Sequence, residues 1–558
     1  MTSGAAVSTR AASSSVLLTL ATGQFLMTLD SSVMNVSIAT VAEDVGTTVT
    51  GIQTAITLYT LVMATLMITG GKVGEILGRK RAFAIGCVIY GVGSFTTALA
   101  QNLTWLLIGW SLLEGIGAAL IMPAIVALVA SNFARPDRPK AYGLVAAAGA
   151  IAVAAGPLIG GLLTTYASWR WVFAGEVVLV IGIVILARRM NDRPANPDAG
   201  LDPVGTALSA LGLGLIVFGI LRGGEWGFVL PKEPHETSWL GLSPVVWLVL
   251  AGGLVLRLFL TWERRRQDSG QPALVDPSLL RVPQLRSGLT SFCFQYLLQA
   301  GIFFVVPLYL SVALGLSAIS TGLRIMPLSI TLLLAAVGIP RFFPHASPRR
   351  VVRLGFLALL AGLVTLIALL DVGVGPEVVT WPLLLAGLGV GALASQLGAV
   401  TVSAVDDEHS AEVGGLQNTV TNLGASIGTA LAGAVLISAL STSFFTGIAD
   451  NPDVPAQVSD QAQVELAGGV PFLSDDDLSD ALGKADVDAT SSAAIVDENS
   501  AARIDALRTS LSLLGLIALL ALFTAGSLPT RPPGAVPDEG SEPDPEADRG
   551  QPPVPSPA

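Results

Sequence analysis

Three acidic residues stand inside long apolar stretches of this 558-residue chain: Asp30, Glu114 and Glu176. A charge at the centre of a membrane-spanning helix costs roughly 2.5–3.5 kcal/mol, so carboxyl groups in such places are rare and usually functional. Burial away from water favours the neutral form of a carboxyl group, which suits reversible proton binding. We therefore expect Asp30 and Glu114 to take up and release protons; the alternative is a carboxyl that stays neutral or paired with a hydroxyl group. For Glu176, a role in proton coupling and an ion pair with Arg170 are equally open.

A second set of polar side chains lies in apolar surroundings and could line a water-filled cavity. Its members are Asn35, Gln295, Tyr296, Gln299, Gln396, Gln417, Asn418 and Asn422. Two pairs are spaced by four residues and would share a helix face, but interhelical hydrogen bonds explain such groups equally well. Arg324, the one basic residue inside a predicted span, could balance a carboxylate or attract an anionic substrate. Snorkelling of its long side chain to the lipid headgroups is slightly favoured over both.

The sequence contains no pattern for a metal, a cofactor or a nucleotide. The three histidines, His235, His345 and His409, are isolated in predicted loops, so we expect no metal site. A phosphate-binding loop is missing, which argues against ATP as the energy source. The net charge of −11 and the lack of a basic patch argue against nucleic-acid binding.

Composition identifies the elements that must hold these residues. Hydrophobic residues make up 52% of the chain and charged residues 13%, about half of the roughly 25% found in soluble domains. This excludes an ordinary soluble enzyme and predicts an all-α integral membrane protein. Apolar runs of about 19 or more residues predict about fourteen spans, which lie near 16–41, 51–71, 81–100, 104–130, 141–166, 171–190, 203–222, 243–262, 285–311, 318–340, 351–371, 378–402, 413–440 and 507–528.

The basic residues indicate the orientation of these spans. With the N-terminal segment 1–15 in the cytoplasm, 23 of the 30 lysines and arginines fall on the cytoplasmic side, as the positive-inside rule requires. We therefore expect a multi-pass plasma-membrane protein with both termini in the cytoplasm. The segment 441–505, with 13 acidic and 2 basic residues, would be an extracellular loop, and a disordered loop is favoured over a partner-binding surface. The proline-rich residues 530–558 should form a disordered cytoplasmic tail.

Two glycine-rich motifs mark places where helices can pack closely. The first follows the second span and comprises Gly71, Gly74, Glu75, Gly78, Arg79, Lys80 and Arg81. Its basic run should anchor the turn at the headgroups, and its acidic residue could cap a neighbouring helix or pair with a nearby arginine. The second motif lies in the fifth span and comprises Gly149, Gly156, Pro157, Gly160 and Gly161. Its proline removes a backbone donor and should kink the helix.

Together these motifs resemble the major facilitator superfamily, and within it the fourteen-helix drug:proton antiporter branch. Residues 71–81 are similar to the family's loop between helices 2 and 3, with Glu75 where the family usually has Asp and Ile76 where it usually has Arg. Residues 156–161 resemble the antiporter motif of helix 5 without departure, and Asp30 falls on the aspartate of helix 1.

Helix 4 departs from the family pattern at two positions. Trp110 stands in place of an arginine that is often tied to proton coupling in the family, and Glu114 stands in place of a glutamine. Without that arginine, the resemblance does not imply that this chain uses the family's usual proton route. Glu114 is the candidate to take over part of the arginine's role.

The resemblance implies a major facilitator fold and secondary transport. Two six-helix bundles, 16–190 and 285–528, would flank a site near the membrane midplane, with an inserted helix pair at 203–262. The implied activity is proton-coupled export of drugs, antibiotics or other amphipathic small molecules across a bacterial plasma membrane, not enzymatic catalysis. Its partners would be a small-molecule substrate, protons and the lipid bilayer, and the proton gradient would replace any cofactor. Export of an endogenous metabolite, peptide or lipid is the first alternative, and a non-transporting receptor that uses the segment 441–505 is the second.

Overall fold

The computed structural model describes residues 2–133, 138–192, 200–231, 239–405, 410–466, 470–485 and 487–530. Within these ranges the regular structure is helical throughout, and no β-strand is formed. In this part of the chain 13 helices are long and apolar enough to cross a membrane, and the two bent parts of α7 (Arg138–Tyr166) bring the number to 14. The prediction of an all-α membrane protein with about fourteen spans is confirmed.

The helices follow one another along the chain in two parts. The first part of the chain forms α1 (Thr2–Val36), α2 (Ile38–Asp44), α3 (Val49–Leu77), α4 (Arg79–Ala98), α5 (Leu103–Leu106), the π-helix η1 (Leu107–Glu114), α6 (Gly115–Asn132), α7 (Arg138–Tyr166), α8 (Arg170–Ala187), α9 (Pro203–Trp226) and α10 (Pro244–Asp268). The second part forms η3 (Leu279–Arg281), α11 (Pro283–Leu308), η4 (Tyr309–Ala313), α12 (Ala318–Phe342), α13 (Pro348–Leu369), η5 (Pro376–Val379), α14 (Thr380–Val402), α15 (Ser410–Asp450), α16 (Ala456–Glu465), α17 (Asp475–Lys484), α18 (Ala489–Ala521) and η6 (Thr524–Ser527).

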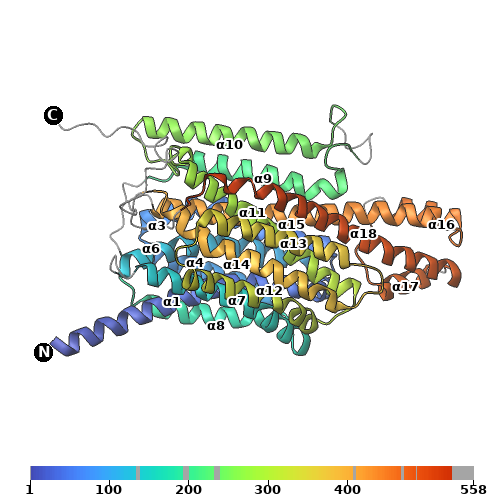
Figure 1. Ribbon diagram of the computed structural model, residues 1–558, viewed down its shortest axis with the longest axis horizontal. Coiled ribbons are helices and arrows are strands. Elements are labelled where there is room, and N and C mark those ends of the chain that lie inside the picture. Colours follow the sequence, from blue (N-terminus) through green and yellow to red (C-terminus); the bar gives the residue numbers. More distant parts are fainter. Residues whose placement is uncertain are drawn as a thin grey trace.

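Most of the long helices run roughly along the longest axis of the molecule (Figure 1). α16 and α17 lie at one end, which we call the outer end, and α1 begins at the opposite, inner end (Figure 1). The pair α9 and α10 covers one edge, where α9 packs on α3 and α15. The helices α1 to α8 meet the helices α11 to α18 mainly where α3 packs on α15 and α7 packs on α12. These two seams are therefore the main contacts between the two halves of the chain.

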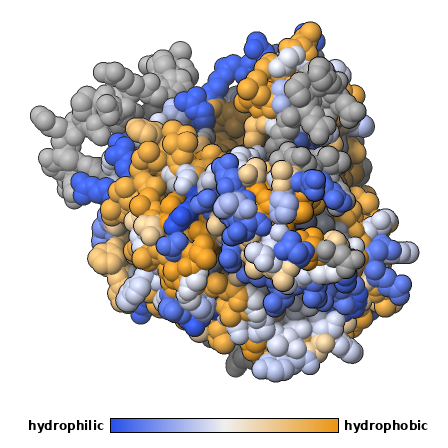
Figure 2. Space-filling view, turned by 90° about the vertical axis from the view of Figure 1, so that its right-hand side faces the viewer, coloured by the Kyte–Doolittle hydropathy of each residue, from blue (hydrophilic) through white to orange (hydrophobic). Residues whose placement is uncertain are grey.

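The surface carries large apolar side chains in the middle of the spans. Val178 is 69% exposed, Leu250 59% and Leu334 66%, as expected where a helix faces lipid rather than water. The outer end is different: Figure 2 shows hydrophilic residues across much of this end, with hydrophobic residues gathered toward its margins. The molecule therefore has the polarity of a protein that spans a bilayer.

The described parts of 441–505 are mostly helical, which differs from the disordered loop that the sequence predicts. α15 continues to Asp450, α18 begins at Ala489, and α16 and α17 lie between them. We call this folded part the outer helical cap, within the described ranges 441–466, 470–485 and 487–505. Its core consists of the buried side chains of Phe444, Ile448, Val454, Val470, Phe472 and Ile495. Burial of these apolar groups explains why so acidic a segment folds.

A buried arginine ties the parts of the outer helical cap together. Arg503 is only 2% exposed; it donates a hydrogen bond of 2.8 Å to the carbonyl of Leu473 and forms an ion pair with Asp475. Because Asp475 also lies in the first turn of α17, it complements the helix dipole there. The predicted cytoplasmic tail lies outside the described residues from 531 onward.

Candidate functional site

Asp30, Glu114 and Glu176 meet inside the first half of the molecule. They come from α1, η1 and α8, and at least one carboxylate oxygen of each lies within 4.8 Å of one from each of the others. Asp30 and Glu114 are 0% exposed and Glu176 is 1% exposed. We call these three residues the carboxyl cluster. The sequence singled out all three, but it gave no indication that they are neighbours.

The indole of Trp110 is the hydrogen-bond donor to Asp30. Its Nε1–H lies 2.8 Å from Oδ1 and 3.0 Å from Oδ2 of Asp30. The Trp110 ring stacks on Tyr59 of α3, with ring centroids 5.0 Å apart and an angle of 9° between the planes. Stacking fixes the indole, so the tryptophan that departs from the family pattern supplies a rigid, uncharged donor where the resemblance has an arginine.

Glu114 is placed by close packing between α4 and η1. Thr97 of α4 donates a hydrogen bond of 3.1 Å to its Oε1. A Cβ atom at Gly93 would lie only 2.6 Å from Cγ of Glu114, and one at Gly109 would lie 2.7 Å from Oγ1 of Thr97. The two helices can therefore approach this closely only because both positions are glycine. The π-helical turn that holds Trp110 and Glu114 is a feature frequent at functional sites.

Glu176 belongs to the carboxyl cluster and does not pair with Arg170. Its Oε2 accepts hydrogen bonds from Ser94 at 3.0 Å and from the hydroxyl of Tyr90 at 3.3 Å. Arg170 instead forms an ion pair with Asp44, the last residue of α2. The alternative of a Glu176–Arg170 pair is thus wrong in the described structure, because the arginine lies at the outer end and reaches toward the connection between α1 and α3.

The Asp44 carboxylate is held by two partners at the outer end. The indole of Trp169 donates to it at 2.8 Å, and the guanidinium group of Arg170 pairs with it. Partial burial acts to raise the pKa of Asp44, but the hydrogen bonds from Trp169 and Arg170 and the charge on Arg170 outweigh it, so the pKa lies below its usual value. This carboxylate is therefore ionised at neutral pH and has a structural role.

Two carboxylate oxygens of the carboxyl cluster are left without a donor. Oε2 of Glu114 and Oε1 of Glu176 are buried and make no hydrogen bond within the described part of the chain, and the same holds for the hydroxyl group of Tyr59. Two ionised carboxylates whose oxygens lie within 4.8 Å of each other repel by at least about 3.5 kcal/mol at an effective dielectric constant of about 20. Uptake of a proton removes that repulsion and supplies a donor, so the geometry is suited to reversible protonation. The oxygen spacing would also suit a metal ion; that no metal binds stays a prediction.

The loop motif after the second span ties the inner ends of the first helices together. Gly78 has a φ of 95°, which only glycine adopts easily. The backbone N–H of Arg79 donates to Asp192 at 3.1 Å, and Nζ of Lys80 donates to the carbonyls of Arg188 and Met190 at 2.8 and 2.9 Å. These contacts bind the α3–α4 turn to the end of α8.

The remaining residues of this motif have simpler surroundings. Glu75 pairs with Lys72 of its own helix at 3.0 Å, and among the described residues it neither caps a neighbouring helix nor pairs with an arginine. Arg81 is exposed. Cβ atoms at Gly71 and Gly74 would make only ordinary contacts of 3.6 Å, which shows that close packing is not what requires glycine at these two positions.

The motif in α7 holds α1 on one side and α12 on the other. Cβ atoms at Gly156 and Gly160 would lie 2.3 Å from Oγ of Ser32 and 3.0 Å from Cα of Val33, both in α1. A Cβ atom at Gly161 would lie 2.7 Å from Cα of Ile319 in α12. Gly149 has more room, since its nearest contact would be 3.4 Å from Gln24. The motif therefore joins the helix that carries Asp30 to the other half of the molecule.

Pro157 bends α7 and frees a backbone carbonyl. The segments Gly143–Val153 and Ala155–Tyr166 are inclined by 41° to each other. Because proline has no N–H, the carbonyl of Val153 loses its partner within the helix. Oγ of Ser329 in α12 donates to that carbonyl at 3.1 Å. Nearer the outer end, Oγ1 of Thr165 accepts a hydrogen bond of 3.0 Å from the N–H of Ile319.

The second seam, between α3 and α15, is also hydrogen-bonded. Nε2 of Gln53 donates to the carbonyls of Thr429 and Ala430 at 3.2 and 3.1 Å, and Oγ of Ser426 donates to the carbonyl of Thr57 at 2.9 Å. These bonds, like those to Val153 and Thr165 of α7, engage the outer halves of α3 and α7. The structure is thus closed between the two halves on its outer side.

The predicted polar residues of the second half form no hydrogen bond with the carboxyl cluster within the described part of the chain. Gln295 is buried and its Oε1 has no partner among the described residues, whereas Tyr296 and Gln299 on the same helix are half-buried. Gln417 accepts a hydrogen bond of 3.1 Å from Thr401, which joins α15 to α14. Arg324 is half-buried and forms no ion pair with a described residue.

The other predicted cavity residues bond locally. Asn35 donates to the carbonyl of Ser31 at 2.7 Å, and Gln396 donates to Ser395 at 3.3 Å. Asn422 donates to the carbonyl of Asn418 at 2.9 Å in the same helix. Sequence reasoning missed the hydroxyl and indole donors around the carboxyl cluster, because such residue types are common in any span and only their juxtaposition is informative.

Comparison with known proteins adds a family and a set of relatives. The Major Facilitator Superfamily model matches residues 20–429. The chain is 30% identical over 454 residues to the puromycin resistance protein of Streptomyces alboniger, covering 80% of this chain and 85% of that one. It is 28% identical over 452 residues to a probable actinorhodin transporter of Streptomyces coelicolor (79% and 74% covered). It is 27% identical over 470 residues to the tetracenomycin C resistance and export protein of Streptomyces glaucescens (82% of each).

Solved structures support the same fold. A bacterial homologue of the human lysosomal transporter spinster, in an inward-facing and unoccupied conformation, superposes with a TM-score of 0.57 at 13% identity, covering 92% of this chain and 97% of that one. A peptide transporter in complex with alafosfalin gives a TM-score of 0.55 at 14% identity, with 91% and 94% covered. At these identities the likeness shows the fold alone.

Proposed function

This chain belongs to the Major Facilitator Superfamily, and from that membership we propose that it is a proton-coupled exporter of amphipathic small molecules, antibiotics among them, across a bacterial plasma membrane. Membership makes it a transporter and places resistance and export proteins among its relatives. Proton coupling, the antiport mode and the direction of transport are the added content of the proposal.

The carboxyl cluster is the observation that carries proton coupling. Three buried carboxyl groups lie together with two oxygens that lack donors. Trp110 and Thr97 donate N–H and O–H groups, and no basic side chain hydrogen-bonds to the cluster in the described structure. Since like charges this close repel each other, the cluster can change its proton content at low cost while its hydrogen-bonding partners stay in place. Protons entering from the outside would neutralise it, and protons leaving to the inside would reset it.

Alternating access supplies the movement that the protonation change must drive. Transporters of this kind rock two bundles about a central site. Here the seams α3–α15 and α7–α12 are hydrogen-bonded in the outer halves of α3 and α7. We infer that these bonds break when the outer side opens and form again when it closes. The substrate class follows from the relatives and from the acidic character of the carboxyl cluster, which favours amphipathic molecules with a positive charge.

The proposed orientation places the inner end in the cytoplasm. Basic residues concentrate in the connections at that end, among them Arg79, Lys80, Arg349 and Arg350, in keeping with the positive-inside rule. The acidic outer helical cap then faces the outside. A membrane-impermeant thiol reagent applied to whole cells tests this directly, because it should label a cysteine placed at Asp480 and not one placed at His345.

Transport by the purified full-length protein in liposomes tests coupling. We expect a fluorescent lipophilic cation to move faster when a pH gradient is imposed, and D30N, E114Q and E176Q to lose that acceleration. E263Q is the matched control: Glu263 is also buried, but it lies on α10 and accepts a 2.6 Å hydrogen bond from the backbone of Leu274, so E263Q should respond like the parent protein. Acceleration by the gradient in D30N at the parent rate would remove Asp30 from the mechanism. Substrate exchange that is insensitive to pH in the parent protein would refute coupling while leaving transport intact.

A further inference from the structure

A cavity of about 830 Å³ opens at the inner end, far along the chain from the carboxyl cluster. It is lined by the end of α12, the connection to α13, the first turns of α13, part of α14 and Thr530. Its size falls within the range of about 300–1,000 Å³ typical of small-molecule sites. Its lining includes no residue of the carboxyl cluster and none of the hydrogen-bonded residues of the two seams.

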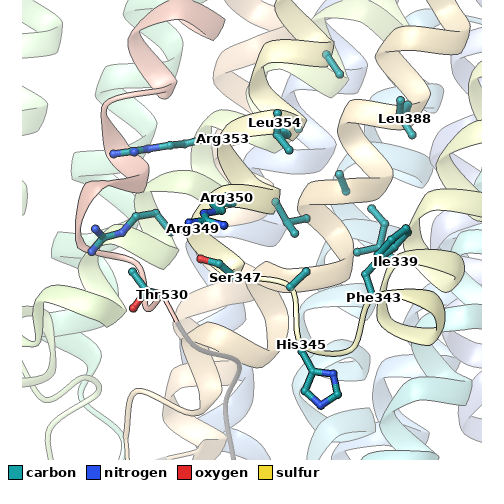
Figure 3. Close-up of a pocket in the computed structure, with 15 residues that line it drawn as sticks. Ile339, Phe343, His345, Ser347, Arg349, Arg350, Arg353, Leu354, Leu388 and Thr530 are labelled. Carbon is teal, nitrogen blue, oxygen red and sulfur yellow. The ribbon is translucent and has the colours of Figure 1, made fainter. Parts of the chain in front are cut away.

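One wall of this cavity is basic and forms no ion pair with an acidic residue that the structure describes. Arg349, Arg350 and Arg353 follow one another along the start of α13 (Figure 3). Nε of Arg349 donates to the carbonyl of Leu528 at 2.8 Å and is held in place by it. Arg350 and Arg353 are exposed and form no ion pair with a described residue. From residue 325 to residue 370 the sequence contains no Asp or Glu at all, so no acidic residue of this stretch balances the positive charge.

The opposite wall is apolar and continuous with the lipid-facing surface. Ile339 of α12, Phe343 just after that helix and Leu388 of α14 lie across the cavity from Arg349 and Arg353 (Figure 3). Leu354, one residue beyond Arg353, is 63% exposed, and Leu388 is 46% exposed. A ligand that fits this cavity must therefore be anionic at one side and apolar at the other.

We propose that this cavity binds an anionic phospholipid of the leaflet at the inner end. The phosphate group would lie between Arg350 and Arg353, and an acyl chain would run along Leu354 and Leu388 into the bilayer. A lipid is favoured over a free phosphate ion because half of the lining is apolar and opens toward the membrane. Basic cavities between spans on the cytoplasmic side suit the headgroups of such lipids.

Binding of phosphatidylglycerol to the purified full-length protein, followed by native mass spectrometry, tests the proposal. We expect R350Q/R353Q to weaken phosphatidylglycerol binding by about thirtyfold, because each arginine near an anionic surface contributes about 1 kcal/mol. R264Q/R265Q removes two exposed arginines at the inner end of α10, and we expect it to change binding less than twofold. R350K/R353K keeps both charges and should retain most of the affinity. Phosphatidylcholine should bind the parent protein and R350Q/R353Q equally.

Three results would overturn the proposal. An equal loss of binding in R350Q/R353Q and R264Q/R265Q would show a general effect of charge rather than a site. Displacement of phosphatidylglycerol by millimolar inorganic phosphate would identify a free anion as the ligand. Phosphatidylglycerol binding that is seen only in a protein ending at Thr530 would identify the acidic segment 531–558 as the occupant. Unchanged thermal unfolding of each variant confirms that it is folded.

Discussion

The hydrogen bond between Ser329 and the carbonyl of Val153 should help to hold the outer side closed. Replacement of Ser329 by alanine removes the donor and leaves the carbonyl that Pro157 frees without a partner. When the outer ends of α7 and α12 separate, this bond must break in any case. S329A should therefore destabilise the outward-closed form and leave the outward-open form unchanged.

The size of the expected shift toward the outward-open form can be estimated from the free energy of hydrogen bonds between membrane-spanning helices. Such bonds contribute about 0.6 kcal/mol on average and up to about 1.7 kcal/mol, which corresponds to a shift of about threefold, and at most about eighteenfold, toward the outward-open form. Gln53 makes two such bonds across the other seam, so Q53L should cause a larger shift. Because the two seams share no residue, the combined variant should show the sum of the two free-energy changes.

Distances between spin labels at the outer end measure this equilibrium. Tyr166 and Trp381 are 75% and 72% exposed and lie at the outer ends of α7 and α14, so cysteines there can carry labels after Cys87 and Cys293 are replaced by alanine. S311A is the matched control, because the Ser311 hydroxyl of η4 donates at 2.8 Å to the carbonyl of Pro307, four residues earlier at the end of α11, and crosses no seam. Equal distance distributions for S329A and S311A would refute the reasoning, and so would a shift of S329A toward the closed form.

Three further changes test the site and its surroundings. G93V should destabilise the protein by about 1–3 kcal/mol through overpacking between α4 and η1, measured by thermal unfolding. G175V is the control and should not destabilise it, because a Cβ atom at Gly175 would have nothing within 4 Å. Equal unfolding temperatures for the two variants would contradict this prediction. W110F keeps a stacked ring but removes the hydrogen-bond donor to Asp30, and a hydrogen bond to a charged acceptor contributes about 1.5–3 kcal/mol. W110F should therefore reduce gradient-driven transport at least about tenfold at unchanged expression. Transport at the parent rate would contradict this prediction. The pKa of Asp44 is lowered in the folded protein, so the ionised Asp44 stabilises the fold above the usual pKa of 3.8, and this stabilisation is lost as the pH falls below that value. D44N should therefore lower the unfolding temperature at pH 7 and make the unfolding temperature fall less in acid. An unchanged fall of the unfolding temperature in acid would contradict this prediction.

The spans and the two glycine motifs could be predicted because their signals are local. Hydropathy alone separates a span from a connection, and Pro157 bends a helix wherever it stands. The same rule on buried charge selected Asp30 and Glu114. Glu176 was left undecided because Arg170 lies six residues before it, and only the fold shows that this arginine pairs with Asp44 instead.

The outer helical cap and the π-helix could not be predicted because their causes are not local. Phe444 and Ile448 share a helix face at a spacing of four residues, which is a weak signal in an acidic segment, and Phe472 and Ile495 complete that core from afar. Likewise, nothing in the sequence of α4 and η1 indicates a wider helical turn; it accompanies the contact that Gly93 permits with Glu114. Tertiary packing decided both features.

The packing around α1 suggests how a protonation change reaches the seam between the two halves. Asp30 lies in the carboxyl cluster, and two residues later Ser32 occupies the space that a side chain at Gly156 would need. One residue after Gly156, Pro157 bends α7 and presents the carbonyl that Ser329 binds. Small residues at these contacts leave no slack in which a shift of α1 could be absorbed. If a change of charge at Asp30 moves α1 by a few tenths of an ångström, α7 must therefore move with it. Because α7 packs on α12 along one of the two seams, a movement of α7 opens or closes that seam.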